Sequence, residues 1–129
     1  MHQSVLKFDH LHVYVQDVDR AANWFVNMFD VEITKTSVRT TANLGGIQIF
    51  FQQADKIEDF AGIPAAKRLG FNHIGLAVVD IDQFAASLKL RGARFTIEPV
   101  TARQGVRMFF VEGPDGLLVE CLERNDKYV

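Results

Sequence analysis

The chain has 129 residues, of which 48% are hydrophobic and eleven are Phe, enough apolar material for one folded domain. No apolar stretch approaches the roughly 20 residues that a bilayer helix needs, and the N-terminus shows no apolar leader, so we expect a cytoplasmic protein that does not cross a membrane. The net charge of −2 lacks the basic excess typical of nucleic-acid binders and excludes that class. A single cysteine, Cys121, cannot form an internal disulfide, and its apolar strand context predicts a buried, unreactive thiol.

The sequence repeats itself once at an offset of 63 residues. Residues 8–19 align without gaps with residues 71–82, and five of the twelve positions are identical, where roughly one identity is expected by chance. Polar and apolar residues alternate from His10 to Val15, the period of two that is typical of a strand. His73 occupies in the second copy the position of His10 in the first. We therefore predict two copies of one structural module, each with a histidine on its first strand.

An amphipathic helix is predicted after each of these strands. Asp17 and Asp80 stand where a side-chain oxygen would accept the free amides of a helix N-terminus. Gly92 stands where a left-handed residue would end the second helix. The apolar positions at helical spacing are Ala21, Trp24, Phe25 and Met28 in the first helix and Ile81, Phe84, Ala85 and Leu88 in the second.

Three strands are predicted after each helix, which gives an α+β fold of two βαβββ modules in tandem. In chain order these strands lie near residues 31–36, 38–42, 47–52, 94–99, 106–111 and 117–123. We expect one domain over residues 1–129, with module one at about 7–53, a polar connector with a short helix at 54–69, and module two at about 70–123. One domain is expected because a module of about 50 residues would bury too little surface alone.

A doubled module with a histidine on each first strand resembles the vicinal oxygen chelate superfamily. Its members include glyoxalase I, methylmalonyl-CoA epimerase, the extradiol dioxygenases, and the fosfomycin and bleomycin resistance proteins. The most specific matching pieces are DHL at 9–11, NHIGLAV at 72–78 and GPDGLLVE at 113–120. The resemblance implies a glyoxalase-like fold in which the two modules form a cupped mixed half-barrel around a divalent ion. It also implies a homodimer, because many two-module relatives are dimers.

The candidate metal ligands are His10, His73 and Glu120. Imidazole nitrogens and a carboxylate oxygen suit borderline divalent ions and leave coordination positions open for a substrate. Glu120 lies in an apolar run, where an unpaired carboxylate would be costly, which favours a ligand over a solvent-facing residue. For the histidines, the alternative is an ordinary hydrogen-bonded role. Nitrogen and oxygen ligands of this kind accept zinc, nickel, cobalt, manganese or iron.

A fourth ligand is expected on the last strand of the first module. Overlaying residues 47–49 on 119–121 makes Gln48 the counterpart of Glu120, which would give the His, Gln, His and Glu set that looks like the epimerase set. Phe50 and Gln52 are the alternatives on the same face. Phe50 at this position would leave three protein ligands, as in the dioxygenases.

His12 points the same way as His10, where relatives usually carry a small residue. It could act as a general acid or base near neutral pH, or it could fill the cup and hydrogen-bond to Tyr14 or Gln48. Glu120 is the other candidate for the catalytic base.

Three functions remain open. The leading hypothesis is a metal-dependent lyase or isomerase of glyoxalase I or epimerase type, in which the ion chelates vicinal oxygens of a small substrate and stabilises an enolate-like intermediate. An extradiol-type dioxygenase with non-haem iron would use the same ligands. A metal-free binding protein of the bleomycin-resistance type would use the aromatic side chains of the cup. Arg39, Arg103 and Arg107 are candidate contacts for an anionic substrate, although ordinary surface charge is the favoured explanation of each.

Overall fold

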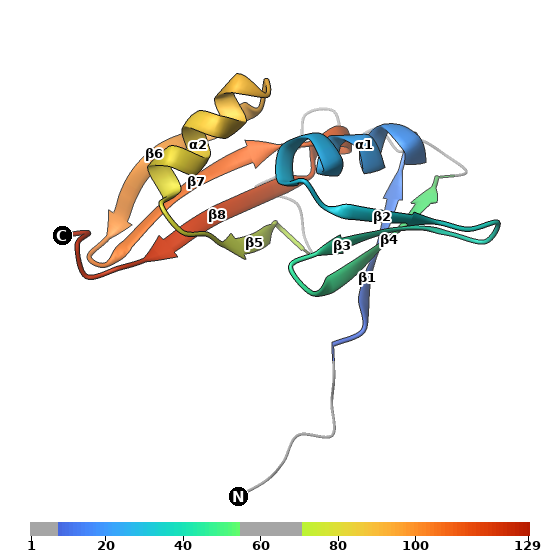
Figure 1. The fold of residues 1–129 in the computed structure, drawn as a ribbon, viewed down its shortest axis with the longest axis horizontal. Coiled ribbons are helices and arrows are strands. Elements are labelled where there is room, and N and C mark those ends of the chain that lie inside the picture. The colour runs from blue at the N-terminus through green and yellow to red at the C-terminus, as the bar shows by residue number, and fades with distance from the viewer. Residues whose placement is uncertain (1–7, 55–70) are drawn as a thin grey trace, which may run out of the picture. The chain divides into compact units, whose positions relative to one another are not determined.

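The structure, a computed structural model, describes residues 8–54 and 71–129. The chain divides into two compact units, residues 1–57 and 58–129, which we call module 1 and module 2 and describe separately. Each module has the element order strand, helix and three strands, which confirms the predicted α+β fold of two βαβββ modules (Figure 1). The predicted connector helix falls in residues 55–70 and lies outside the described residues.

The elements agree with the predicted ranges to within a few residues, except that β6 continues to Arg103. Module 1 consists of β1 (His10–Val15), α1 (Val18–Phe29), β2 (Glu32–Lys35), β3 (Thr40–Leu44) and β4 (Ile47–Gln53). Module 2 consists of β5 (Ile74–Ala77), α2 (Ile81–Leu90), β6 (Arg94–Arg103), β7 (Val106–Glu112) and β8 (Leu118–Arg124), with a short 3-10 turn, η2 (Pro114–Gly116), before β8. Neither α1 nor α2 is long and apolar enough to cross a membrane.

Both modules contain a mixed four-stranded sheet with the same topology. The strand orders are β1-β4-β3-β2 and β5-β8-β7-β6. In each sheet the first strand pairs in parallel with the last, and the other pairs are antiparallel. The helix and the two strands between them supply the long connection that a parallel pair requires. The residues of the first strand therefore lie directly beside those of the last.

In module 1, α1 covers one face of the sheet, and the core forms between them. Phe25 of α1 is fully buried and its ring lies 5.7 Å from that of Phe51 on β4. Trp24 is half-buried at the edge of this core and meets Phe25 edge-on at 5.0 Å. The buried hydrophobic residues of module 1 are Val15, Ala21, Ala22, Phe25, Met28, Ala42, Leu44, Ile49 and Phe51. Because the buried residues of β1 and β4 face α1, the alternate residues of these strands face the other way.

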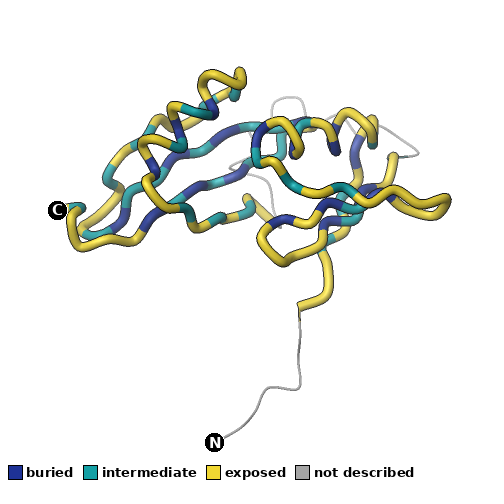
Figure 2. The backbone as a smooth tube through the Cα atoms, in the orientation of Figure 1, coloured by how far each residue is buried: buried dark blue, intermediate teal, exposed yellow. Residues whose placement is uncertain are grey.

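Module 2 repeats this arrangement with α2 against β6, β7 and β8. Phe109 of β7 is fully buried, with the rings of Phe84 and Phe95 at 6.3 and 5.2 Å. The buried positions alternate with more exposed ones along β8 (Figure 2). Cys121 is fully buried, as predicted, and burial raises the pKa of its thiol to about 12. The buried hydrophobic residues of module 2 are Ile81, Ala85, Leu88, Val106, Phe109, Val111, Val119 and Cys121.

The two helices begin differently, although the sequence predicts the same cap for both. The Asp17 carboxylate accepts a hydrogen bond from the Arg20 amide at 3.0 Å, which confirms it as the N-cap of α1. Asp80 makes no side-chain cap, and this prediction is wrong. Its backbone is left-handed, with φ 53° and ψ 62°, whereas an N-cap side chain works from an extended backbone. Glu123 of β8 takes over this role and accepts from the Ile81 amide at 3.2 Å.

Gly92 ends α2 as predicted. Its φ of +82° places it in the left-handed region, which glycine enters at little cost. The Gly92 amide donates to the Lys89 carbonyl at 3.1 Å, and the Ala93 amide donates to the Leu88 carbonyl at 3.0 Å. These two bonds form a Schellman motif, which satisfies carbonyl groups that the end of the helix would otherwise leave open.

Candidate functional site

The face of each sheet that its helix leaves uncovered carries the predicted site residues. We call this the open face. In module 1, the alternation along β1 puts His10, His12 and Tyr14 on the open face, as predicted. The strand register adds three neighbours from β4: Gln48 beside His10, Phe50 beside His12, and Gln52 beside Tyr14.

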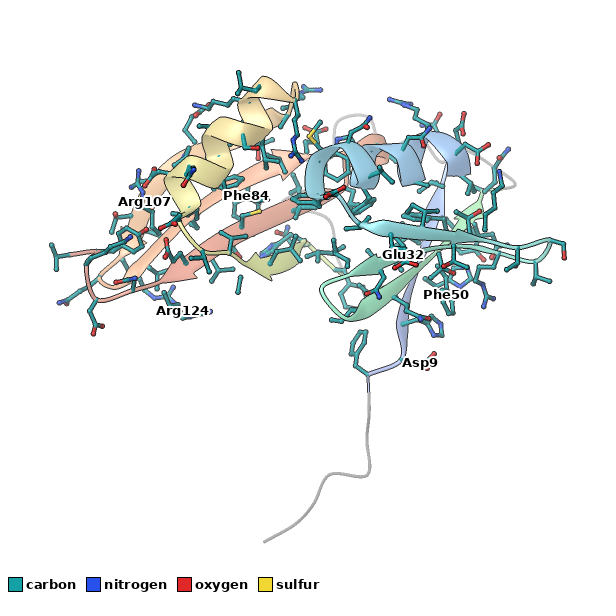
Figure 3. All side chains as sticks on the ribbon, viewed as in Figure 1. Asp9, Glu32, Phe50, Phe84, Arg107 and Arg124 are labelled. Carbon is teal, nitrogen blue, oxygen red and sulfur yellow. The ribbon has the colours of Figure 1, made fainter. Side chains whose placement is uncertain are left out.

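His10 is held from two sides. Its Nδ1 lies 2.7 Å from the Asp9 carboxylate, and its ring stacks on Phe50 with the centroids 4.1 Å apart. Phe50 and Asp9 are labelled in Figure 3. Because a carboxylate only accepts when ionised, Nδ1 carries the proton and donates to Asp9. Nε2 of His10 therefore keeps the lone pair that a metal ion or a proton can use.

The strand register identifies a different counterpart of Glu120 from the sequence overlay. Glu120 lies opposite Gly75 in module 2, and Gly75 corresponds to His12 at the offset of 63. The residue opposite His12 is Phe50 rather than Gln48. The overlay that selected Gln48 assumed an offset of 72, whereas the register gives 120 − 50 = 70. Gln48 lies instead directly opposite His10, and its role as a ligand stays a prediction.

His12 has one hydrogen-bonding partner that the sequence did not single out. Its Nε2 lies 2.8 Å from the Gln52 Oε1, whereas the predicted partners were Tyr14 or Gln48. The Tyr14 ring packs beside it, with the centroids 5.4 Å apart. An amide oxygen only accepts, so Nε2 of His12 carries the proton and Nδ1 is its basic nitrogen.

In module 2, His73 and Glu120 lie together on the open face. The His73 Nε2 is 3.2 Å from the Glu120 Oε1, and the His73 ring meets Phe110 edge-on at 4.9 Å. The two side chains are partly exposed, at 34% and 21%. The Nδ1 of His73 lies 2.7 Å from the Asn72 Oδ1, which only accepts, so Nε2 of the neutral ring carries a lone pair. The contact with Glu120 is therefore attractive when a second proton or a cation joins the two atoms.

The two histidines share a feature that the sequence analysis missed. The His73 Nδ1 lies 2.7 Å from the Asn72 Oδ1, just as the His10 Nδ1 lies 2.7 Å from Asp9. Metal-binding histidines commonly donate their second nitrogen to such an oxygen, which fixes the tautomer and the ring orientation. The sequence signal was present, because Asp9 and Asn72 occupy equivalent positions of the repeat.

Two of the arginines that were predicted to contact an anionic substrate, Arg107 and Arg39, have different surroundings. Arg107 donates from Nε and Nη2 to the Asp82 carboxylate at 2.8 Å each, which lowers the pKa of Asp82 and raises that of Arg107. Arg39 lies over the Phe50 ring on the open face of module 1, with its Cζ 4.1 Å from the ring centroid. Within residues 8–54 and 71–129, no three His, Cys, Asp or Glu side chains cluster closely enough to hold a metal ion.

Comparison with known proteins decides the family. A family model described as the Glyoxalase/Bleomycin resistance protein/Dioxygenase superfamily matches residues 7–121. The chain belongs to this superfamily. A probable chloroplastic lactoylglutathione lyase of Arabidopsis thaliana is 38% identical over 56 residues, which cover 43% of this chain. The chain spans only 16% of the length of that relative.

Solved structures of the superfamily share the fold. A glyoxalase family protein from Bacillus cereus has a TM-score of 0.74 and 19% identity, with 95% of this chain and 97% of that chain covered. A variant of the fosfomycin resistance protein FosX from Listeria monocytogenes has a TM-score of 0.69 and 18% identity, with 92% and 90% covered. That structure is a complex with Mn(II) and 1S,2S-dihydroxypropylphosphonic acid.

Proposed function

We propose that this protein is a metal-dependent lyase or isomerase of the superfamily, with His10, His73 and Glu120 as the ligands of one divalent ion. The observation that carries the proposal is the contact between the His73 Nε2 and Glu120 Oε1 at 3.2 Å, with the His73 Nδ1 already engaged by Asn72. Two donor atoms thus converge on the open face of module 2, and both are of types that borderline divalent ions accept.

The donor set fits such an ion. Both histidines are oriented to offer Nε2, because Asp9 and Asn72 occupy their Nδ1 atoms. Two imidazoles and one carboxylate leave coordination positions open for a substrate. Gln48, opposite His10 in the register, is proposed as a fourth ligand. Zinc, nickel, cobalt, manganese and iron all accept these ligands, and the Mn(II) in the FosX complex is consistent with this range.

The chain supplies its own groups for proton transfer. A bound divalent ion would stabilise negative charge on two neighbouring oxygens of a small substrate. His12 offers Nδ1 as a proton acceptor, because Gln52 occupies its Nε2. Glu120 is the second candidate proton acceptor, a role that requires it to leave the ion during turnover, and its partial burial reduces its access to bulk water. The expected chemistry is removal and return of a proton next to a substrate carbonyl group.

An iron-dependent extradiol-type dioxygenase is the second candidate function. The observation that favours it is Phe50 in the position equivalent to Glu120, which leaves two histidines and one carboxylate as ligands. Such a set with open positions is typical of non-haem iron oxygenases.

Metal content per chain, measured by elemental mass spectrometry on the purified protein, tests the proposal. Near-stoichiometric metal is expected in the wild type and in a Glu98→Gln control, which removes an exposed acid of module 2. The His73→Ala and Glu120→Ala variants are expected to lose the metal. A wild-type protein that contains no metal and takes up none on dialysis would contradict the proposal and favour a ligand-binding protein. Iron together with oxygen-dependent turnover of a catechol would favour the dioxygenase.

We further propose a homodimer, and a mixing experiment asks whether its sites are shared between chains. His10→Ala and His73→Ala chains are mixed under conditions in which dimers exchange. Ligands from two different chains would restore one intact site in each mixed dimer, whereas ligands from the same chain would restore none. Light scattering on the same samples checks that dimers are present.

A further inference from the structure

We infer that Arg39 is a specificity-determining residue that binds an oxyanion group of the substrate, a carboxylate or a phosphonate, beside His10. This inference deepens the proposed function and rests on it for the role of His10 as a ligand. Its basis is the position of Arg39 on the open face of module 1.

The Phe50 ring contacts two nitrogen-containing side chains, those of His10 and Arg39. The His10 ring stacks on it at 4.1 Å with 19° between the planes, and the Arg39 Cζ lies 4.1 Å from its centroid. β1, which carries His10, and β3, which begins directly after Arg39, flank β4 on opposite sides. The contact between Arg39 and Phe50 is a cation–π interaction, and the N–H groups of a guanidinium lie at the edge of its plane, where they can donate to an oxyanion.

The backbone at Arg39 is fixed by its turn. The Thr36 hydroxyl accepts from the Arg39 amide at 3.1 Å and lies 3.2 Å from the Arg39 carbonyl, while the Thr36 amide donates to that carbonyl at 2.9 Å. These hydrogen bonds fix the backbone of Arg39, and the contact with Phe50 helps to orient its exposed side chain. A side chain that is partly oriented before the ligand arrives loses less conformational entropy on binding than one without such a contact.

The charge around Arg39 favours an anionic ligand. Within residues 8–54 and 71–129, Arg39 forms no ion pair with an acid. Arg107, by comparison, is already neutralised by Asp82. On the open face the neighbours of Phe50 along β4 are Gln48 and Gln52, which are uncharged. A guanidinium in such surroundings binds two oxygens of a carboxylate or phosphonate through paired hydrogen bonds.

The test is an NMR titration of the full chain with small probes at constant pH and ionic strength. Acetate and methylphosphonate present the two oxyanions, and acetamide is the uncharged control. We expect one or both anions to shift the Arg39 Nε–Hε signal to saturation and acetamide to leave it unchanged. The anion with the lower dissociation constant identifies the group that the site prefers.

Variants separate Arg39 from general surface charge. Arg39→Gln is expected to weaken anion binding roughly tenfold or more, since it removes the charge-assisted hydrogen bonds to the anion. Arg39→Lys should recover part of the affinity, and Phe50→Leu should weaken binding without removing any charge. Arg124→Gln, which removes an exposed arginine of module 2, should have no effect. Equal anion affinity in Arg39→Gln and the wild type, or equal binding of acetamide, would overturn the inference.

Metal content measured on the same samples keeps the two proposals distinguishable. Arg39→Gln is expected to retain the metal of the wild type, because Arg39 is not one of the proposed ligands. A wild-type protein without metal but with Arg39-dependent anion binding would contradict the proposed function and leave Arg39 as an anion-binding residue. Metal bound in the wild type together with anion binding that does not depend on Arg39 would overturn the inference alone.

Discussion

The two modules have the same topology, but the side chains that contact their histidines differ in chemical type. In module 2, His73 meets a carboxylate, Glu120, at 3.2 Å. In module 1, His10 meets an aromatic ring, Phe50, at 4.1 Å. Both histidines nevertheless keep the same Nδ1 contact with the side chain of the preceding residue. The repeat has thus kept the orientation of the histidine and changed what lies across from it.

This difference shows how two copies of one fold can carry different functional groups. Module 2 supplies a histidine and an acid, which together suit a cation. Module 1 supplies a second histidine, the imidazole of His12, and the guanidinium of Arg39, which together suit proton transfer and an anionic substrate. Under the proposed function, the two modules would therefore contribute different chemical groups.

The cores of the two modules give the largest expected effects. Each has one fully buried Phe at its centre, Phe25 on a helix and Phe109 on a strand. Phe25→Ala and Phe109→Ala should each lower the free energy of unfolding by about 3–5 kcal/mol, because each leaves a cavity. Urea denaturation followed by circular dichroism measures the loss. A loss below about 1 kcal/mol in either variant would show that the core of that module is not packed as described.

The N-terminus of α2 depends on the Glu123 carboxylate, so its contribution to the stability of the protein should depend on pH. Glu123 accepts hydrogen bonds from the Tyr128 hydroxyl and the Ile81 amide, which hold its pKa below the usual 4.5. The stabilisation from Glu123 is therefore present above pH 4.5 and is lost as the pH falls through the lowered pKa. Glu123→Gln should lower the urea midpoint at pH 7 and flatten its fall below pH 4.5. Equal acid sensitivity in both proteins would contradict this account.

The Tyr128 hydroxyl should make the stability of the protein fall as the pH rises, which is the opposite of the effect of Glu123. Its hydrogen bond to Glu123 raises its pKa from 10.0 to about 12, because the neighbouring carboxylate disfavours the phenolate. The stabilisation is therefore complete below pH 10 and is lost as the pH rises toward 12. Tyr128→Phe should be less stable than the wild type at pH 8 and should show a smaller further loss above pH 10. Thermal unfolding across this range is the measurement.

The caps of the two helices predict effects of opposite sign. Asp17→Ala removes a formed cap and should cost about 1 kcal/mol. Asp80→Gly relieves a left-handed backbone without removing a cap, and it should change stability by less than about 1 kcal/mol, toward stabilisation. Urea midpoints of both variants measure the two effects. A destabilised Asp80→Gly would show that the Asp80 side chain has a contact that matters.

The smallest expected effects come from equivalent acids of the repeat. Asp19 pairs with Lys35 through one contact of 3.0 Å, whereas Asp82 pairs with Arg107 through two contacts of 2.8 Å. Both acids are exposed, so Asp19→Asn and Asp82→Asn should each cost less than about 1 kcal/mol. The loss should be larger for Asp82 and should shrink in high salt. A larger loss for Asp19 would contradict the comparison.

The repeat in the sequence predicted the fold because strand alternation and helix spacing are local signals. The open-face positions of His10, His12 and Tyr14 followed from alternation alone. The residues of β4 that pair with β1 could not be predicted in this way. The loops of the two modules differ in length, so the offset between equivalent residues of the two copies grows from 63 at the first strand to 70 at the last. Phe50 rather than Gln48 therefore lies in the position equivalent to Glu120.

The contacts that the sequence could not predict are those between distant segments. The cap at Ile81 comes from Glu123, 42 residues away, and the partner of His12 is Gln52, 40 residues away. No local pattern marks such pairs. Asp9 and Asn72 could have been found, since each directly precedes its histidine in both copies of the repeat.

The most direct test of the central claim is to count the histidines bound to one ion. Electron spin-echo spectroscopy of the protein loaded with Mn(II) detects the nitrogens of coordinated imidazoles. The account predicts two histidines in the wild type, and one histidine each in His10→Ala and His73→Ala when excess Mn(II) offsets their weaker binding. A wild-type spectrum with a single histidine that His10→Ala leaves unchanged would contradict the claim that both modules bind the same ion.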